Sequence, residues 1–195
     1  PNLLHLDISS STIDDSSFEI LLGAIIKNKS LIKLNISCIS ISIKIATHLS
    51  ALIGNQTTIQ YYNLYNIFES MESFAICFDK LQINSSVHTL LLGNNKIDDN
   101  KLPLLLNSLG NNKKLTFLDL IQNNITYKSL NNIRTWLIPI KLTFDTLFDG
   151  SYKSNMNKLS IFRLTNNYLD SMSYPIILDI INNNINLTIF SLDYG

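Results

Sequence analysis

The chain has 195 residues, of which 46% are hydrophobic, and its 15 basic and 15 acidic side chains give a net charge of zero. A chain of this length and apolar content can bury a large core. Its neutral charge excludes the general electrostatic attraction to DNA, RNA or anionic membranes that basic proteins show, so we expect no nucleic-acid partner.

The two cysteines, Cys38 and Cys77, form no CxxC pair, which favours a reducing, cytoplasmic compartment. The longest apolar runs, such as residues 20–26, are too short for the roughly 20 residues of a membrane helix, so no membrane segment is expected. No linker-like stretch divides the chain, which indicates one domain over residues 1–195. Because the chain begins at Pro1, we interpret it as a fragment.

One pattern, L-x-x-L-x-L-x-x-N-x-L, recurs along the whole chain. Its starts lie near residues 3, 31, 59, 87, 115, 159 and 187, so every step is 28 residues except one of 44. The copies at Val87 and Leu115 fit best, and the copy at Ile59 is the weakest. A fixed period of this length is the signature of a repeat architecture.

The second and third copies are irregular at the ninth position, where Ile39 and Ile67 replace asparagine. Cys38 and Asn66 precede them by one residue. We interpret this as a slightly reset turn in these two repeats.

Each position of the pattern has a physical reason. Alternate residues of a strand face opposite sides, so the leucines of L-x-L point into the core and the residues between them point outward. The asparagine pairs with backbone groups of adjacent turns that would otherwise be buried without partners. Apolar residues at third and fourth spacings, such as Leu102, Leu105 and Leu109, predict a helix in the second half of each repeat.

The stacking of such units predicts the overall shape. Parallel strands stack about 4.8 Å apart whereas packed helices need about 8–10 Å, so the solenoid bends. We expect an α/β fold: a right-handed leucine-rich-repeat horseshoe with a parallel sheet on its concave face and helices on its convex face. The chain starts and stops close to or inside repeats, which predicts further repeats beyond both ends.

The 28-residue period with a helical outer half resembles the ribonuclease-inhibitor-like leucine-rich-repeat proteins. Ribonuclease inhibitor, the sensor regions of NOD-like receptors, tropomodulin and the Ran GTPase-activating proteins have repeats of this kind. The resemblance covers essentially the whole chain. It implies the fold and a protein-binding role, but these proteins bind unrelated partners on a shared framework.

A 16-residue excess separates the fifth and sixth repeats, near residues 138–153. Loops inserted into a rigid scaffold often carry function, which makes this segment a second candidate site. Leu142, Phe144 and Leu147 also suit an extension of the core, so a structural role stays open.

The outward strand positions of repeats three to six carry an apolar centre with charged residues around it. Aromatic and arginine side chains are typical anchors of protein interfaces, and a large exposed apolar patch marks a binding surface. Chance occupation of these positions, or coverage by a flanking segment, is the alternative. The candidate partner-binding residues are Tyr61, Tyr65, Leu91, Phe117, Asp119, Ile121, Ile161 and Arg163.

Signals for catalysis are absent from the sequence. No Walker A, GxGxxG, HExxH or GxSxG motif occurs, and the histidines and cysteines have no metal-ligand spacing. We therefore expect no enzyme activity, no cofactor and no metal. The sequence predicts a protein-interaction scaffold; a GTPase-activating-protein-like regulator or the sensor region of a larger receptor are the alternatives that the resemblance implies.

Overall fold

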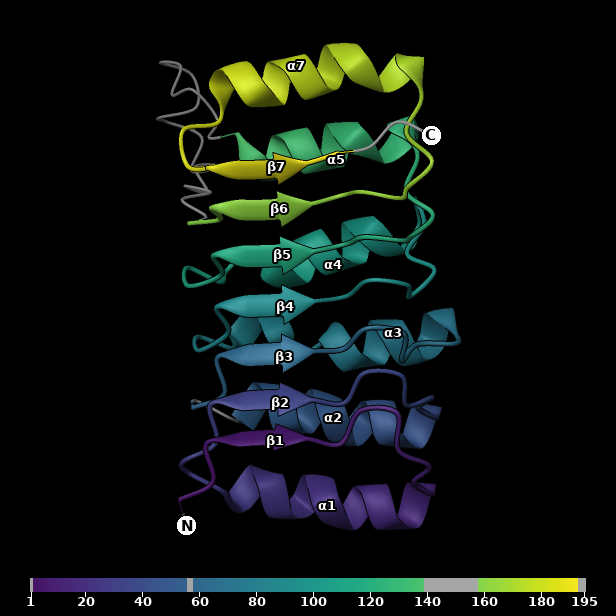
Figure 1. The fold of residues 1–195 in the computed structure, drawn as a ribbon, viewed down its shortest axis with the longest axis vertical. Coiled ribbons are helices and arrows are strands. Elements are labelled where there is room, and N and C mark those ends of the chain that lie inside the picture. The colour runs from purple at the N-terminus through teal and green to yellow at the C-terminus, as the bar shows by residue number, and fades with distance from the viewer. Residues whose placement is uncertain (1, 56–57, 139–157, 193–195) are drawn as a thin grey trace, which may run out of the picture.

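The computed structural model describes residues 2–55, 58–138 and 158–192, which form a single parallel sheet of seven strands and six α-helices (Figure 1). The strands are β1 His5–Asp7, β2 Lys33–Asn35, β3 Tyr61–Asn63, β4 Thr89–Leu91, β5 Phe117–Asp119, β6 Ile161–Arg163 and β7 Ile189–Ser191. The helices are α1 Asp15–Lys27, α2 Ile43–Asn55, α3 Met71–Phe78, α4 Lys101–Leu109, α5 Tyr127–Leu137 and α7 Tyr174–Asn183, with two short 3₁₀ helices at Leu81–Ile83 and Ser171–Ser173.

The strands pair in chain order from β1 to β7, and every pair is parallel. Each helix packs against the next one along the chain, and the helices lie behind the sheet in Figure 1. The predicted α/β fold with one parallel sheet is confirmed. The excess near residues 138–153 lies outside the described residues apart from Ile138, so both interpretations of it stay predictions.

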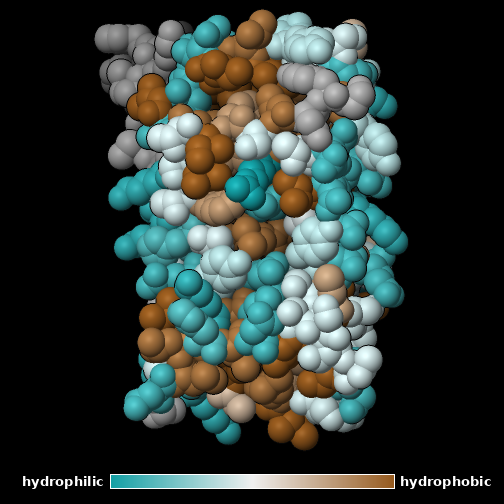
Figure 2. Space-filling model, viewed as in Figure 1, coloured by the Kyte–Doolittle hydropathy of each residue, from teal (hydrophilic) through white to brown (hydrophobic). Residues whose placement is uncertain are grey.

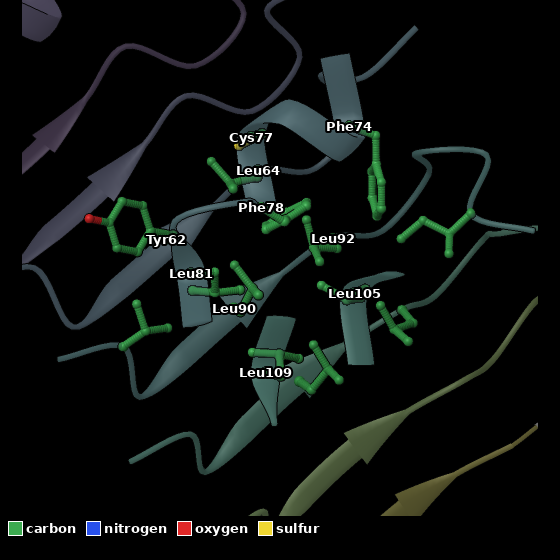
Figure 3. Packing of buried hydrophobic residues seen from close by; sticks show 14 of the residues in the cluster. Tyr62, Leu64, Phe74, Cys77, Phe78, Leu81, Leu90, Leu92, Leu105 and Leu109 are labelled. Carbon is green, nitrogen blue, oxygen red and sulfur yellow. The ribbon is translucent and has the colours of Figure 1, made fainter. Parts of the chain in front are cut away.

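The core lies between the sheet and the helices. The middle residue of each inner strand is buried, as at Leu90 and Leu118, because it points from the sheet toward the helices. Figure 3 shows side chains of β3, β4, α3 and α4 converging in this layer. The rings of Phe68, Phe74 and Phe78 pack edge-on or tilted, with centroids 4.9–5.5 Å apart. These contacts bury the side chains at the apolar positions of the repeat.

A ladder of buried asparagines joins the turns that follow the strands. Asn123 donates to the backbone oxygens of Leu92, Leu120 and Ile121 at 3.0–3.1 Å and accepts from the amides of Asn95 and Ile97 at 2.9 Å. Asn95 and Asn167 bond in the same way to the repeats beside them. The predicted pairing of the ninth-position asparagine with backbone groups is confirmed.

A second series of asparagines, which the sequence pattern did not predict, joins the ends of the helices to the next strands. Each accepts from the backbone amides two and three residues later, at 2.7–2.8 Å for Asn112 and 2.8–2.9 Å for Asn84. Three of them also donate to a backbone oxygen, Asn84 and Asn184 in the preceding repeat and Asn112 at the start of its own repeat. The members are Asn28, Asn84, Asn112 and Asn184.

The turn after each strand has the same backbone conformation in the first six repeats. The eighth residue of the pattern has a φ of 53–57° at Ser10, Cys38, Asn66, Asn94, Gln122 and Asn166. The amides of Cys38 and Asn66 donate to the next repeat, at 2.8 and 2.9 Å, just as that of Asn94 does at 3.0 Å. The expectation of a reset turn in the second and third repeats is therefore wrong. In the third repeat, the side chain of Asn95 in the following repeat accepts from the amides of Ile67 and Phe68 and so supports the turn.

Replacement of Tyr62 by phenylalanine should stabilise the protein. Among the described residues, the Tyr62 hydroxyl is the one buried side-chain polar atom without a hydrogen-bond partner, and burial raises its pKa. Loss of an unsatisfied buried hydroxyl should raise the free energy of unfolding by about 1 kcal/mol and the Tm by about 2–4 °C. Thermal unfolding of wild type and Tyr62→Phe measures the difference; a lower Tm for the variant would show that the hydroxyl has a stabilising partner.

Replacement of Asn123 by alanine should cost at least about 3 kcal/mol of unfolding free energy, because several buried backbone groups lose their partner at once. The neighbouring Asn124 is exposed, so Asn124→Ala should change stability by less than about 0.5 kcal/mol. Urea unfolding of the two variants tests the ladder. Equal stabilities for both would contradict it.

Candidate protein-binding surface

The eight candidate residues define what we call the strand-face patch: Tyr61, Tyr65, Leu91, Phe117, Asp119, Ile121, Ile161 and Arg163. They lie on β3 to β6 or in the turns that follow these strands, on the side of the sheet away from the helices. Figure 2 shows that apolar and strongly hydrophilic side chains alternate over this part of the sheet. The structure divides the patch into two clusters and two further residues.

The first cluster surrounds Arg163. Its guanidinium lies over the Phe117 ring, 5.1 Å from the centroid, and its Nη1 is 3.6 Å from Oδ2 of Asp119. Ile161 pairs with Phe117 in the register of β5 and β6. The Arg163 side chain remains 46% exposed. It is therefore held in place from below while its outer edge is available to a partner.

The second cluster consists of Tyr65 and Ile121, whose side chains both lie close to Gly93. A Cβ added at Gly93 would lie 2.7 Å from the Tyr65 ring and 2.9 Å from Ile121, so these two side chains meet above it. The Tyr65 hydroxyl donates to Oε1 of Gln122 at 2.5 Å, which connects the third repeat to the fifth. Any larger residue in place of Gly93 would displace the ring. The glycine thus allows one aromatic face to cover three repeats.

Tyr61 lies apart from these clusters, and Leu91 borders the first one through its pairing with Asp119. Thr89 separates Tyr61 from Phe117 in the register, and Nζ of Lys33 is 5.8 Å from the centre of the Tyr61 ring. Burial raises the pKa of Tyr61, with a smaller effect of the Asp7 and Asp119 carboxylates, so its hydroxyl stays protonated at neutral pH. Leu91 lies between Asn63 and Asp119.

Asp119 has an internal role that the sequence did not indicate. It is 6% exposed, and its Oδ1 accepts from the amide of Ile121 at 3.0 Å. Asp7, Asn35 and Asn63 at the same position of their repeats accept from the amide two residues later in the same way. Short polar side chains are suited to such local turns. The carboxylate of Asp119 therefore orders the turn after β5, and its other oxygen faces Arg163.

The six apolar members are all partly buried, because side chains on strands about 4.8 Å apart cover one another. The sequence pattern did not place Gln122 or Thr89 among the candidate residues, and it placed Lys33 among the charges around them. Nothing in the sequence pattern indicated that Gln122 belongs to the surface patch. It follows the outward strand positions of its repeat, and the left-handed turn brings its side chain to the Tyr65 hydroxyl. Together these residues offer aromatic area, hydroxyl and amide groups, and two cations.

The described part of the chain holds no helix long and apolar enough to cross a membrane. Within the same residues, no three His, Cys, Asp or Glu side chains are grouped so as to hold a metal ion.

The substitution Asp119→Asn should stabilise the protein increasingly as the pH rises. Burial raises the pKa of Asp119 above its usual 3.8, although the Ile121 amide and Arg163 partly oppose this. Below pH 3.8 the carboxyl is protonated in both the folded and the unfolded chain; as the pH rises through the raised pKa, its charge is formed in a buried site and stability is lost. Asparagine keeps an oxygen for the Ile121 amide and has no such loss.

The unfolding free energies of wild type and Asp119→Asn between pH 3 and pH 7 test this. Asp14→Asn is the control, and it should lose stability relative to the wild type as the pH rises. Hydrogen bonds from Ser17 lower the pKa of Asp14, so its ionised form stabilises the folded protein. An advantage of Asp119→Asn that shrinks with rising pH would contradict the burial cost.

No family model and no curated protein matches the chain. Among solved structures, it is similar to the tropomodulin C-terminal domain of Caenorhabditis elegans, with 13% identity, a TM-score of 0.49, and coverage of 91% of this chain and 83% of that one. It is also similar to the Leiomodin-1 Actin-Binding Site 2, with 14% identity, a TM-score of 0.45, and coverage of 95% and 82%.

These comparisons correct the expected subfamily. The repeat pattern predicts a ribonuclease-inhibitor-like protein; no family model matches the chain, and the two similar structures are domains of tropomodulin and leiomodin. The assignment is wrong because it depended on the repeat period and the framework leucines and asparagines. Those features are required by the packing of a strand–helix unit, so they do not distinguish between subfamilies.

Proposed function

We propose that the chain is a protein-binding module that takes its partner on the strand-face patch. The observation that carries the proposal is the cluster of Arg163, Phe117 and Asp119, in which an exposed guanidinium is fixed by a ring below it and a buried carboxylate beside it. Arginine and aromatic side chains dominate the binding energy of protein interfaces.

Pre-organisation supports the proposal. A side chain that is already ordered loses less conformational entropy on binding, which amounts to about 0.5–1.5 kcal/mol for each immobilised side chain. Arg163 is held by two contacts, and Tyr65 is held by Gly93, Ile121 and Gln122. The two clusters therefore form rigid anchors, and both include residues of β5 or of the turn after it.

We infer that the molecule curves as a right-handed horseshoe with the patch on its concave side. In Figure 1, α1 lies beyond β1 and α7 lies beyond β7, so the row of helices extends past both ends of the sheet. Helices about 8–10 Å apart behind strands about 4.8 Å apart require this curvature. A concave sheet suits a convex protein surface.

We propose a binding scaffold that has no enzyme activity of its own. The alternatives, a GTPase-activating-protein-like regulator and the sensor region of a receptor, rest on a repeat period that does not discriminate between subfamilies. We place the protein in the cytoplasm because Cys38 and Cys77 are both free thiols, Cys38 exposed and Cys77 buried.

Replacement of Tyr61, Tyr65 and Phe117 together by serine should weaken partner binding at least about 100-fold, since each interface anchor is typically worth more than 1 kcal/mol. Proteins that co-purify with the wild type from extracts of the source cells are identified and purified, and their affinities are measured by calorimetry. Purified actin forms a separate arm, because the similarity to a leiomodin domain does not assign actin to this chain.

The matched control replaces three exposed apolar residues on the helices by serine: Ile20 on α1, Met71 on α3 and Leu104 on α4. It should bind like the wild type, and circular dichroism should show both triple variants folded. Binding that survives the strand-face variant but is lost in the helix-face control would place the partner on the other side of the molecule.

A further inference from the structure

The exposed charges on the middle of the strand face are both positive. Lys33 on β2 and Arg163 on β6 are exposed, and each cation lies over an aromatic ring of the face. Asp119 is the one acidic residue at the outward positions of β2 to β6, and it is 6% exposed. One of its carboxylate oxygens accepts from the amide of Ile121. A partner that covers this face therefore meets positive charge.

The contacts within the protein leave donors of both cations available. Arg163 faces Asp119 through Nη1 at 3.6 Å, and a guanidinium has five N–H donors. Lys33 forms no ion pair with any described residue. Asp7 on the neighbouring β1 accepts from the amide and the hydroxyl of Ser9 at 2.9 and 2.7 Å, which uses its carboxylate internally. Both cations can therefore bind carboxylates of a partner.

The spacing of the two cations limits the shape of that partner. β3, β4 and β5 separate β2 from β6, and neighbouring strands lie about 4.8 Å apart, so Lys33 and Arg163 start about 19 Å from each other. An α-helix rises about 5.4 Å per turn. Acidic residues three to four turns apart on one side of a helix would reach both cations, and the apolar residues between them would cover Tyr61 and Phe117.

The sheet favours a helix over an extended segment. Each strand from β2 to β6 is paired on both sides, so its backbone groups are not free to pair with an added strand. An extended segment would place unpaired amides and carbonyls on the apolar patch, whereas a helix satisfies these groups internally. The apolar side chains spread along β5 and its turn from Phe117 to Ile121, about 13 Å, which matches the roughly 10–12 Å diameter of a helix.

We propose that the strand face binds an acidic amphipathic helix that crosses the strands from β2 to β6. Its apolar side packs on Tyr61, Tyr65 and Phe117. Two acidic residues, one near each end of the contact, bind Lys33 and Arg163. This inference rests on the proposed function, because it names the kind of partner that the same surface takes. The two charged contacts would fix the direction and register of the helix and exclude basic segments.

Selection from a displayed library of designed helices tests the proposal. Each peptide of about 24 residues has leucines along one side, and two positions on that side, three to four turns apart, vary among Glu, Gln and Lys. A companion library has a proline at the centre of every peptide, which breaks the helix. On the wild type, Glu should be enriched over Lys at least about 10-fold at both varied positions, and only in the helical library.

Lys33→Glu gives the sharpest comparison, because it reverses one cation and leaves Arg163 in place. Selection on this variant should enrich Lys at one varied position and keep Glu at the other. Lys128→Glu is the matched control, since Lys128 is exposed on α5 and the net charge changes by the same amount. This control should select Glu at both positions. Circular dichroism should show both variants folded.

The variant with Tyr61, Tyr65 and Phe117 replaced by serine separates this inference from the proposed function. Helices selected on the wild type should lose binding to it. A helical library without binders, no preference for Glu, binders from the proline library alone, or selected helices that bind the triple variant as tightly as the wild type would each overturn the acidic helix. The proposed function fails separately, if the purified natural partner binds the triple variant as tightly as the wild type.

Discussion

The structure depends on the pairing of backbone groups that are buried where the chain leaves each strand and each helix. A strand of three residues followed by a turn exposes amides and carbonyls to an apolar core, where an unpaired group costs about 1–3 kcal/mol. Asn95, Asn123 and Asn167 satisfy these groups on the strand side, and Asn28, Asn84, Asn112 and Asn184 do so on the helix side. Each asparagine bonds within or next to its own repeat, so the fold extends one repeat at a time.

That regularity places the strand-face patch. Because all the strands share one register, outward residues of successive repeats form rows, and Phe117 must lie beside Ile161. The rows alone do not make a site. The site arises where the regular pattern is varied, with a glycine at position 93 that admits the Tyr65 ring and an arginine at position 163 that reaches Phe117 and Asp119.

The periodic features could be predicted from the sequence, and the contacts that depend on side-chain length or conformation could not. The 28-residue frame located the strands and the buried leucines, because each is fixed by alternation along the strand. It failed at Cys38 and Asn66, where the backbone adopts the usual left-handed turn without an asparagine at the next position. It also missed the partnership of Tyr65 with Gln122, which spans two repeats, and the burial of Asp119, which results from its neighbours on both adjacent strands. The asparagines at 28, 84, 112 and 184 did carry a signal, since each precedes a repeat start by three residues.

The central claim is that a protein partner occupies the strand face, and methyl NMR of the labelled protein with its purified partner tests it most directly. Leu91, Ile121 and Ile161 report on the strand face, whereas Ile20 and Leu104 report on the helices. Titration with the partner should shift the methyl signals of Leu91, Ile121 and Ile161 and leave those of Ile20 and Leu104 unchanged. Shifts confined to Ile20 and Leu104 would contradict it.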